Sequence, residues 1–517
     1  MTREKINSDS VFYKNAVHLS MMKIEIPNEA AGVGKALQEA GFEAYFVGGC
    51  VRDIILGRIP KDWDIATNAL PEDILKIFPD SVYENDFGTV GVKMVDKENE
   101  SITRIVEVTT YRIEGKYTDK RHPDAVKFAK TIEEDLSRRD FTINALALKC
   151  DTEARTPSKI IKELVDPFGG QDDLKKNSIR AVGNPEERFS EDALRLMRAV
   201  RFATELDFSI ELNTRRAIEK YSHELVLIAK ERIRDEFVKI MMSPNATKGI
   251  LLLEELNLLA SILPEFREGI GVAQNHHHIY TVFEHSIRSL DYTAKKNYSL
   301  EVRMAALLHD VGKPRAKEGA GVDTTFYQHE YIGAKVAFKI LDRLRFPKEF
   351  VDKVTHLIRR HMFYYNVGEI SEAGVRRFLV RVGPENIDDL LKVREADRMG
   401  SGVKKAVPYK LRHLLFMIEK VKKDPLSPKM LKVNGEDIME LLSIVPGPRV
   451  GWVLSSLLEE VLDDPTKNEK EYLLERAREI GILSDDVLKE AALRAREKKD
   501  EFEAGTNEEI KKKYYVT

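Results

Sequence analysis

The chain has 517 residues, of which 33% are charged, and its formal net charge is only −3. This length is too great for one hydrophobic core and predicts roughly three or four domains, while the balanced charge excludes a uniformly basic nucleic-acid-binding protein. Two cysteines, Cys50 and Cys150, exclude a disulfide framework. Because no long apolar run or signal segment occurs, we expect a soluble cytoplasmic protein without a membrane partner.

The first part of the chain has a mixed α/β pattern. After an extension over residues 1–22, the stretch AGVGKALQEAG predicts a helix. Five short runs rich in β-branched residues then predict strands: AYFVGG, WDIAT, TVGVKMV, ITRIVEVTTYR and FTINALAL. We therefore expect a small α/β head with a sheet of about five strands over residues 23–150.

The remainder of the chain is predicted to be helical. Apolar residues recur at helical spacing in SEDALRLMRAVRFATEL, in NTRRAIEKYSHELVLIAKERIRDEFVKIMM and in EYLLERAREIGIL. The charged C-terminal stretch EAALRAREKKDEFEAGTNEEIKKKYYVT predicts a helix with a frayed end. The predicted fold class is thus α+β, a small α/β head followed by a long all-α region.

The stretch FVGGCVRDIILGRIPKDWDIAT, residues 46–67, concentrates chemically active residues between two predicted strands. Asp62 and Asp64 are two residues apart, so on a strand both carboxylates lie on one face, about 7 Å apart. A divalent cation suits such a pair, and two cations are a known arrangement for in-line displacement at phosphorus. Gly48 and Gly49 allow backbone N–H groups to approach a triphosphate, and Arg52 can contact phosphate. The alternative is a surface turn with solvated aspartates.

Several motifs resemble one enzyme family. GGCVRDIILGRIPKDWDIAT is similar to the first motif of class II nucleotidyltransferases, which include tRNA CCA-adding enzymes and bacterial poly(A) polymerases, and RRDFTINALAL (138–148) is similar to the second. Residues 166–206 resemble the neck of these enzymes, and residues 433–465 resemble the tail of bacterial CCA-adding enzymes. The resemblance implies a nucleotidyltransferase head that binds Mg²⁺, followed by a helical neck, body and tail.

The resemblance also implies roles for individual residues of the head. Asp62 and Asp64 would bind Mg²⁺, and Gly49 and Arg52 would contact the nucleotide. Arg139 would contact the incoming nucleotide, and Asp140 its ribose. We interpret Glu107, in RIVEVTTYR, as a candidate third catalytic carboxylate, although a solvated glutamate is an equal alternative.

Base selection is predicted for the segment EDALRLMRAVR. If this segment is one helix, Asp192, Arg195 and Arg198 are neighbours, whereas Arg201 lies nearly opposite Asp192. The Asp192 carboxylate can accept from cytosine N4 or adenine N6 and would reject the carbonyls of uracil and guanine, while Arg195 donates to a ring acceptor. The family is understood to select C and A in this way. The alternative is an ion pair between Glu191 and Arg195 with a solvated basic stripe.

The resemblance implies that the substrates are tRNA, CTP and ATP. Poly(A) polymerases usually have EDPVR where this chain has EDALR, and the loop YRIEGKYTDKRHPDAVKF (111–128) favours complete CCA addition. An enzyme that adds only A remains an alternative, as does a poly(A) polymerase.

Eight of the twelve histidines lie between residues 276 and 361: His276, His277, His278, His285, His309, His329, His356 and His361. The surrounding sequence, including AALLHDVGK, resembles an HD domain, a metal-dependent phosphohydrolase module. The resemblance implies that a divalent metal of unknown identity is held by His285, His309, Asp310 and Asp397, and a second by His329 and His361. Asp388 and Asp389 are rivals of Asp397. The domain would hydrolyse 2′,3′-cyclic phosphates or phosphomonoesters, or be inactive and structural.

The predicted domains after the head are a neck and body over 151–275, an HD domain over 276–400 and a tRNA-binding tail over 401–517. Basic residues at 215–216, 402–413 and 420–432 together suggest a path for the tRNA acceptor and TΨC arms, recognised by phosphate and shape, although each run alone is more typical of a solvated helix face. Basic residues at 359–360, beside His361, would guide RNA ends to the HD site. A different class of function, an HD hydrolase whose head only binds nucleotide, would require a degenerate head, and the head motifs are intact.

Overall fold

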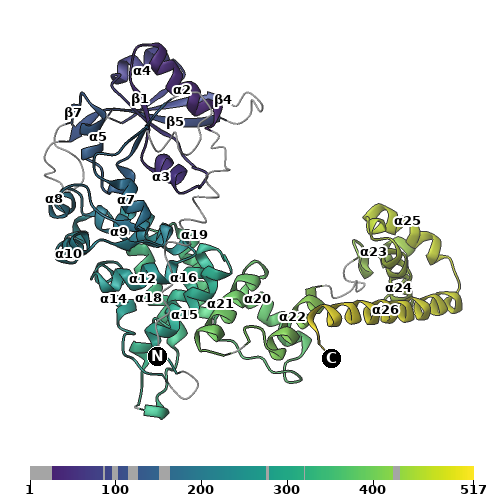
Figure 1. The fold of residues 1–517 in the computed structure, drawn as a ribbon. Helices are drawn as coiled ribbons and strands as arrows, with labels where there is room; N and C mark the ends of the chain where they lie inside the picture. The colour runs from purple at the N-terminus through teal and green to yellow at the C-terminus, as the bar shows by residue number, and fades with distance from the viewer. Residues whose placement is uncertain are drawn as a thin grey trace. The chain divides into compact units, whose positions relative to one another are not determined.

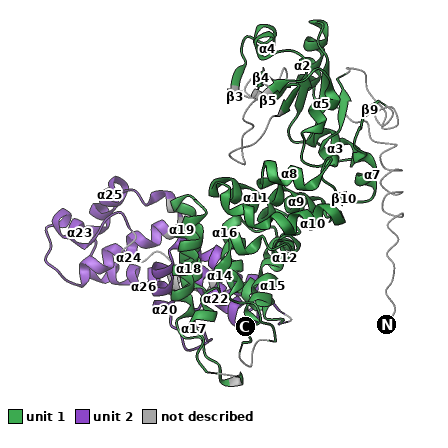
Figure 2. Cartoon of the chain, turned by 90° about the vertical axis from the view of Figure 1, so that its left-hand side faces the viewer, with its two compact units in different colours: residues 1–361, 392–402 green, residues 362–391, 403–517 purple. Residues whose placement is uncertain are grey.

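The computed structural model describes residues 26–85, 88–95, 103–114, 126–150, 163–274, 279–319, 321–403, 405–422 and 431–516. The chain forms two compact units, residues 1–361 with 392–402 and residues 362–391 with 403–517 (Figure 2). This division differs from the predicted boundary at residue 400, because residues 362–391 belong to the second unit. The predicted N-terminal extension, the histidines at 276–278, residues 115–125 of the loop at 111–128 and residues 423–430 of one basic run lie outside the described residues.

A seven-stranded mixed sheet forms the head. Its order is β3-β4-β5-β2-β1-β8-β9. The strands are β1 (Ala44–Val47), β2 (Asp64–Thr67), β3 (Val82–Asn85), β4 (Thr89–Val95), β5 (Thr103–Thr110), β8 (Ala147–Lys149) and β9 (Leu164–Val165). Each of the five predicted runs contains a strand, although in FTINALAL only β8 is extended and residues Thr142–Asn144 form the 3-10 helix η1. The sheet is wider than expected because β3 and β9 add short edge strands, and a separate hairpin pairs β6 (Arg112–Glu114) with β7 (Val126–Phe128).

Helices pack against the sheet of the head (Figure 1). The helices α2 (Asn28–Glu39) and α4 (Pro71–Ile77) both contact β4 and β5. Leu37, Phe46, Ile65 and Val108 are fully buried in the head core. On the other side, α3 (Gly49–Ile55) starts immediately after β1 and contacts η1, so the first motif and the second motif meet at the end of β1.

Helices follow the head in the first unit. They are α7 (Gly170–Lys175), α8 (Pro185–Glu191), α9 (Leu194–Leu206), α10 (Leu212–Tyr221), α11 (Lys230–Met242), α12 (Ala246–Glu255), α13 (Leu259–Ile262) and α14 (Pro264–Arg267), with η2 (Ser222–Leu227) between α10 and α11 and a short parallel pair, β10 (Ser178–Ile179) and β11 (Ser209–Ile210). The helix α5 (Ile132–Ser137) belongs to the head, where it precedes β8. The continuous helix predicted over residues 190–206 is wrong, because Asp192 is extended between α8 and α9. The Asp192 carboxylate accepts from the Leu194 N–H at 2.9 Å, and this local bond competes with helix continuation.

A second group of helices in the first unit carries the histidines. They are α15 (Val282–Lys295), α16 (Leu300–Leu308), α17 (Lys313–Ala316), α18 (His329–Arg343), α19 (Lys348–Arg360) and the C-terminal part of α21 (Ile387–Gly400). A capping box of Thr281 and Glu284 starts α15, since each side chain accepts from the other residue's backbone N–H. The contacts of α16 with α15 and α19, and of α18 with α19, bring residues far apart in the sequence to one place.

The second unit is helical in its described residues. It contains α20 (Glu372–Val382), α22 (Tyr409–Lys422), α23 (Gly435–Leu442), α24 (Pro448–Asp463), α25 (Lys470–Gly481) and α26 (Asp485–Tyr514). The predicted fraying of the C-terminal helix is wrong, because Ile510 and Val516 pack with Phe416 of α22, and Tyr514 donates to Glu419 at 2.7 Å. In the part of the chain that is described, no helix has both the length and the apolarity needed to cross a membrane.

Candidate active and metal sites

Carboxylates gather where β2 begins. Asp64 is the first residue of β2, and its partner in the parallel pairing with β5 is Glu107, so the two side chains lie on the same face of the sheet. Asp62 precedes the strand in an exposed bend. Burial raises the pKa of Asp64 and the Asp62 charge raises it further, whereas Arg139 lowers it. A carboxylate whose ionisation is disfavoured by burial and by a second carboxylate nearby fits the hard-oxygen ligand set of a divalent cation.

Glycines let the first motif approach the second. Gly48 has φ of 74°, and a Cβ atom there would lie 3.0 Å from Arg139 Nη1 and 3.7 Å from Asp64 Oδ2. A Cβ atom on Gly49 would lie 3.7 Å from Arg52 Nη2. The structure therefore brings Gly48, Gly49, Arg52, Asp64 and Arg139 together at the end of β1. A larger residue at Gly48 would be strained and would crowd both Arg139 and Asp64.

Two further residues hold the arginines, and the sequence analysis did not identify them. Arg52 Nη1 donates to Asn144 Oδ1 at 2.8 Å, and Arg139 Nη2 lies 3.2 Å from Asp135 Oδ2. Asp135 is buried, and Arg138 also donates to it at 2.9 Å. The spacing of Asp135 to the two following arginines, three and four residues along a helix, is the signal that could have revealed it.

Asp140 joins the second motif to α9. Its Oδ2 accepts from Arg198 Nε at 2.6 Å, and its Oδ1 accepts from the Phe141 N–H at 2.8 Å and from Asn144 Nδ2 at 3.3 Å. Burial alone would raise the pKa of Asp140, but the Arg198 and Arg195 charges hold it below its usual value. The ribose contact proposed for Asp140 stays a prediction, because both carboxylate oxygens already accept hydrogen bonds from protein groups.

The break between α8 and α9 changes the expected environment of Asp192. Arg232 Nη2 of α11 donates to Asp192 Oδ2 at 2.8 Å, a partner that no sequence spacing indicated. Arg195 is buried, pairs with Glu191, and donates to the carbonyls of Arg188 at 3.0 Å and Arg138 at 3.3 Å. The ion pair that the alternative interpretation expected is therefore present.

Arg201, the last predicted pocket residue, is directed toward another helix. Its Nε atom lies 2.8 Å from Glu236 Oε2 of α11, and its guanidinium is 4.0 Å from the Phe202 ring centroid. Both Arg201 and Arg198 thus have acidic partners that organise the neck. Their contact with a nucleotide stays a prediction.

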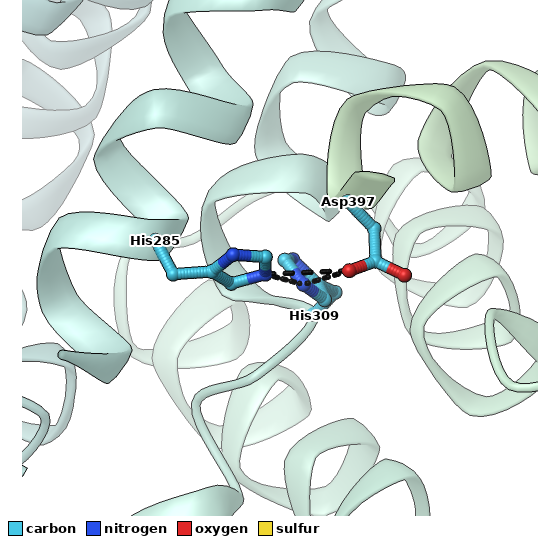
Figure 3. A group of neighbouring side chains, drawn as sticks. All are labelled: His285, His309 and Asp397. Atoms are coloured by element: carbon cyan, nitrogen blue, oxygen red, sulfur yellow. Dashed lines mark hydrogen bonds and ion pairs between the residues drawn. The ribbon is translucent and has the colours of Figure 1, made fainter. Parts of the chain in front are cut away.

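A buried cluster forms a separate site among the histidine-bearing helices. Figure 3 shows His285, His309 and Asp397 converging from different parts of the chain. The Nε2 atoms of His285 and His309 are 3.0 Å apart, and Asp397 Oδ1 lies 3.3 Å from the first and 3.8 Å from the second. At metal–nitrogen distances of about 2.0–2.1 Å, two nitrogens on one ion lie about 3 Å apart, so the trio fits one cation. Asp397, rather than Asp388 or Asp389, belongs to this group.

Asp310 connects this trio to a second group. Its Oδ2 lies 3.3 Å from the Nε2 atoms of His285 and His309, and its Oδ1 lies 3.4 Å from His329 Nε2 and 3.9 Å from His361 Nε2. Asp310, His329 and His361 form a second candidate ligand set, with their ligand atoms within 4.8 Å of one another. A carboxylate with one oxygen toward each set is suited to bridge two cations.

Backbone carbonyls fix the imidazole tautomers. The Nδ1 atoms of His309, His329 and His361 lie 2.8, 2.8 and 2.6 Å from the carbonyl oxygens of Ala306, Phe326 and Ile358. A carbonyl only accepts, so each Nδ1 carries a proton, and Nε2 is the ring nitrogen that faces the cluster. Burial lowers the pKa of His361 to about 3, which keeps this imidazole neutral and able to bind metal. The donor set therefore fits divalent cations.

Lys313 is a further member of this site that the sequence analysis did not single out. Its Nζ lies 2.7 Å from Asp310 Oδ2 and donates to Gln274 Oε1 at 2.6 Å. The pKa of Asp310 is well below its usual value, because His309 and Lys313 outweigh the effect of its burial. The signal was its position in HDVGK, three residues after Asp310. His356, although part of the histidine-rich region, is in neither ligand group.

Comparisons with known proteins agree with this geometry. Residues 44–180 match the family described as Poly A polymerase head domain, residues 207–269 match the Probable RNA and SrmB- binding site of polymerase A, and residues 282–399 match the HD domain. The CCA-adding enzyme of Enterococcus faecalis is 34% identical over 468 residues, which are 88% of this chain and 97% of that one. The A-adding tRNA nucleotidyltransferase of Deinococcus radiodurans is 38% identical over 349 residues, 65% of this chain and 76% of that one.

A solved structure supports the fold along most of the chain. The crystal structure of the Bacillus stearothermophilus CCA-adding enzyme in complex with CTP aligns with a TM-score of 0.54 and 30% sequence identity. The alignment covers 88% of this chain and 98% of that chain.

Proposed function

Because this chain belongs to the family of the CCA-adding enzymes, we propose that it adds C, C and A to tRNA 3′ ends from CTP and ATP and releases pyrophosphate. The observation that carries this proposal is the convergence of Gly48, Asp64 and Arg139, from the two head motifs, at the end of β1. At the end of β1, carboxylates that can bind cations therefore lie beside glycines and arginines that can bind a triphosphate.

Different residues of the head have different roles in the proposed nucleotidyl transfer. Asp62, Asp64 and Glu107 would hold Mg²⁺, which in such sites activates the attacking 3′-hydroxyl and stabilises the leaving pyrophosphate. The backbone at Gly48 and Gly49 approaches the triphosphate without side-chain hindrance, and the guanidinium groups of Arg52 and Arg139 bind its oxygens. Asn144 and Asp135 hold these two arginines in place before substrate binds.

Asp192 and Arg195 would select the base, with Arg198 and Arg201 completing the pocket. The Asp192 carboxylate accepts from the exocyclic amine of cytosine or adenine and repels the carbonyl of uracil or guanine. Its oxygens are oriented by Leu194 and Arg232.

Other parts of the chain would bind tRNA. The helical region 151–275 contains the stretch matched to an RNA-binding family, and the tail over 401–517 contains basic runs. Both would contact phosphates and the shape of the acceptor and TΨC arms. With tRNA, CTP and ATP as substrates, the proposed place of action is the cytoplasm.

A substrate series tests the proposal and separates the alternatives. The protein is incubated with three tRNAs, ending before CCA, after C or after CC, each with labelled CTP or ATP. Complete CCA addition predicts CTP use by the first two and ATP use by the third. ATP use by the CC-ended tRNA alone would identify an A-adding enzyme, and long A tails would identify a poly(A) polymerase.

A second activity is favoured by the bridging position of Asp310 between two histidine sets. We propose that the region over residues 276–400 is a metal-dependent phosphohydrolase acting on 2′,3′-cyclic phosphates or phosphomonoesters. Metal-bound water is a nucleophile near neutral pH, and Lys313 lies beside the bridging carboxylate. Hydrolysis assays with Mg²⁺, Mn²⁺, Co²⁺ and Ni²⁺ test it, and no hydrolysis with any of them would indicate a structural domain.

A further inference from the structure

The second unit contains a cavity of about 440 Å³ beside α20. Its volume is in the range of about 300–1,000 Å³ that small-molecule sites occupy. Aromatic side chains and arginines dominate its lining, which comprises Phe363, Tyr364, Tyr365, Ile370, Gly374, Val375, Arg377, Phe378, Arg381 and Leu414. The lining is therefore aromatic and basic, and the Glu369 carboxylate, which accepts from the hydroxyl of Tyr364, is outside it.

The rings of the cavity are held in place by other side chains. Phe363 and Phe378 pack with centroids 5.2 Å apart and an interplanar angle of 52°. The Tyr365 hydroxyl lies 2.6 Å from His413 Nδ1 of α22. Tyr364 is 68% exposed, and its ring therefore offers a face to a ligand. A rigid aromatic wall with one exposed ring suits a flat, unpaired base.

The two arginines of the cavity differ from the neighbouring basic residues. Arg377 and Arg381 are four residues apart on α20, so they project on one face of the helix about 6 Å apart. Both are exposed and form no ion pair with any described residue. By contrast, Arg376 and Lys420 both pair with Glu372, at 3.8 and 2.6 Å. Charges that are not neutralised at the mouth of an aromatic cavity are available for phosphate.

We propose that this cavity, which nothing above assigns a role, binds an unpaired nucleotide of an RNA. The base stacks on Tyr364 and the neighbouring rings, and Arg377 and Arg381 contact the phosphates on either side of it. Such binding tolerates different bases and weakens steeply with salt. This inference rests on the proposed function in one respect: an enzyme that acts on tRNA would bring RNA to this unit.

Photocrosslinking of the full chain tests this proposal. The probe is a hexauridylate containing one 5-iodouridine, and the adduct is located by mass spectrometry. We expect the label on residues 362–382. Tyr364→Ala and the double variant Arg377→Ala, Arg381→Ala should each weaken apparent binding at this peptide by about five- to a hundredfold. Tyr364→Phe should retain labelling. Arg376→Ala removes the same charge from the same helix outside the cavity and is the matched control, with circular dichroism as the test of folding.

The position of the crosslink and its competition by free nucleotides decide whether this cavity binds RNA. Absence of label from residues 362–382, or an equal loss in Arg376→Ala, overturns the site. Free UMP or ATP that displaces the probe as well as unlabelled hexauridylate shows a mononucleotide site and overturns the RNA assignment. Nucleotide addition by the unmodified protein is measured separately with the three tRNAs. Crosslinking at residues 362–382 by unmodified protein that adds no nucleotide to any of these tRNAs would keep this inference and contradict the proposed function.

Discussion

Arg232 of α11 donates through Nη2 to Asp192 Oδ2 at 2.8 Å, across the break between α8 and α9. The other carboxylate oxygen of Asp192 accepts from the Leu194 N–H at 2.9 Å. The group proposed to select the base is thus held from two sides by the protein. An oriented acceptor discriminates more strongly than a mobile one, because a wrong base cannot be accommodated by rotation of the carboxylate.

Replacement of Arg232 by alanine is therefore expected to reduce discrimination. The ratio of kcat/KM for CTP over UTP, and for ATP over GTP, should fall several-fold, with a larger fall in Asp192→Ala, which loses a base contact of about 1–3 kcal/mol. Arg232→Lys should recover part of the ratio. Arg234→Ala on the same helix, whose arginine pairs with Asp235, is the control. An equal fall in kcat/KM for all four nucleotides would indicate a purely structural role.

Asp62→Ala and Asp64→Ala are expected to abolish nucleotide addition. Each removes a proposed ligand of Mg²⁺, while tRNA binding and the melting temperature should change little because neither residue is part of the core. Incorporation of labelled CTP and a tRNA gel shift measure the two effects. Asp73→Ala, at a half-buried aspartate of α4 that pairs with Lys76 away from the proposed site, should retain full activity. More than a few per cent of residual activity in either active-site variant would contradict the two-cation assignment.

Asp140→Asn is expected to lower stability in a pH-dependent way. The pKa of Asp140 is lowered in the folded protein, so its stabilising effect is present above its unfolded pKa of about 3.9 and is lost as pH falls through the lower folded value. The variant should lose about 2 kcal/mol at pH 7, and its melting temperature should approach that of the unmodified protein below pH 4. Asp172→Asn, at an exposed ion pair, should show little difference at any pH. A constant gap across pH would mean that charge is not the cause.

The double variant His309→Ala, Asp310→Ala is expected to lose metal-dependent hydrolysis and to keep CCA addition within a few-fold of normal. The two sites use different ligands, and nucleotidyl transfer uses the tRNA 3′-hydroxyl rather than metal-bound water. Both activities are measured on one preparation whose folding is confirmed by circular dichroism. His309→Ala and Asp310→Ala both truncate buried side chains, so Asp397→Asn, which keeps the size of a buried side chain, provides a milder second variant. Parallel loss of both activities in both variants would show that this cluster supports the body as a whole.

Divalent metal is expected to stabilise the protein through the histidine cluster. The His285 and His309 Nε2 atoms, 3.0 Å apart, and the Nε2 atoms of His329 and His361 that face the cluster are better satisfied around cations. Melting temperature should therefore rise with added Mn²⁺ or Ni²⁺ and fall after chelation. The shift should disappear in the His309→Ala, Asp310→Ala variant. An unchanged shift there would place the stabilising ion elsewhere.

The sequence by itself determined the strands of the head and the residues that we propose for its chemistry. Runs of β-branched residues predict strands because strand preference depends on neighbouring residues in the sequence. In the two motifs, short spacings between glycine, arginine and aspartate restrict where these side chains can lie. Each of the five predicted runs contains a strand, and Gly48, Asp64 and Arg139 meet as expected. The resemblance to HD domains likewise implied the residues that gather around His309, although which aspartate of α21 completes the group was open.

Only the tertiary structure decided which partners these residues have. The helix break at Asp192 depends on a local carboxylate bond that helical periodicity conceals, and Arg232 reaches it from forty residues away. Contacts between distant segments also place Asp310 between the two histidine sets and give Asp140 its hydrogen bond from Arg198. Such contacts likewise assign residues 362–391 to the second unit. Sequence spacing specifies which side of a helix or strand a residue occupies. The group that it meets there is set by the packing of other elements, because long-range contacts leave no periodic signal in a single chain.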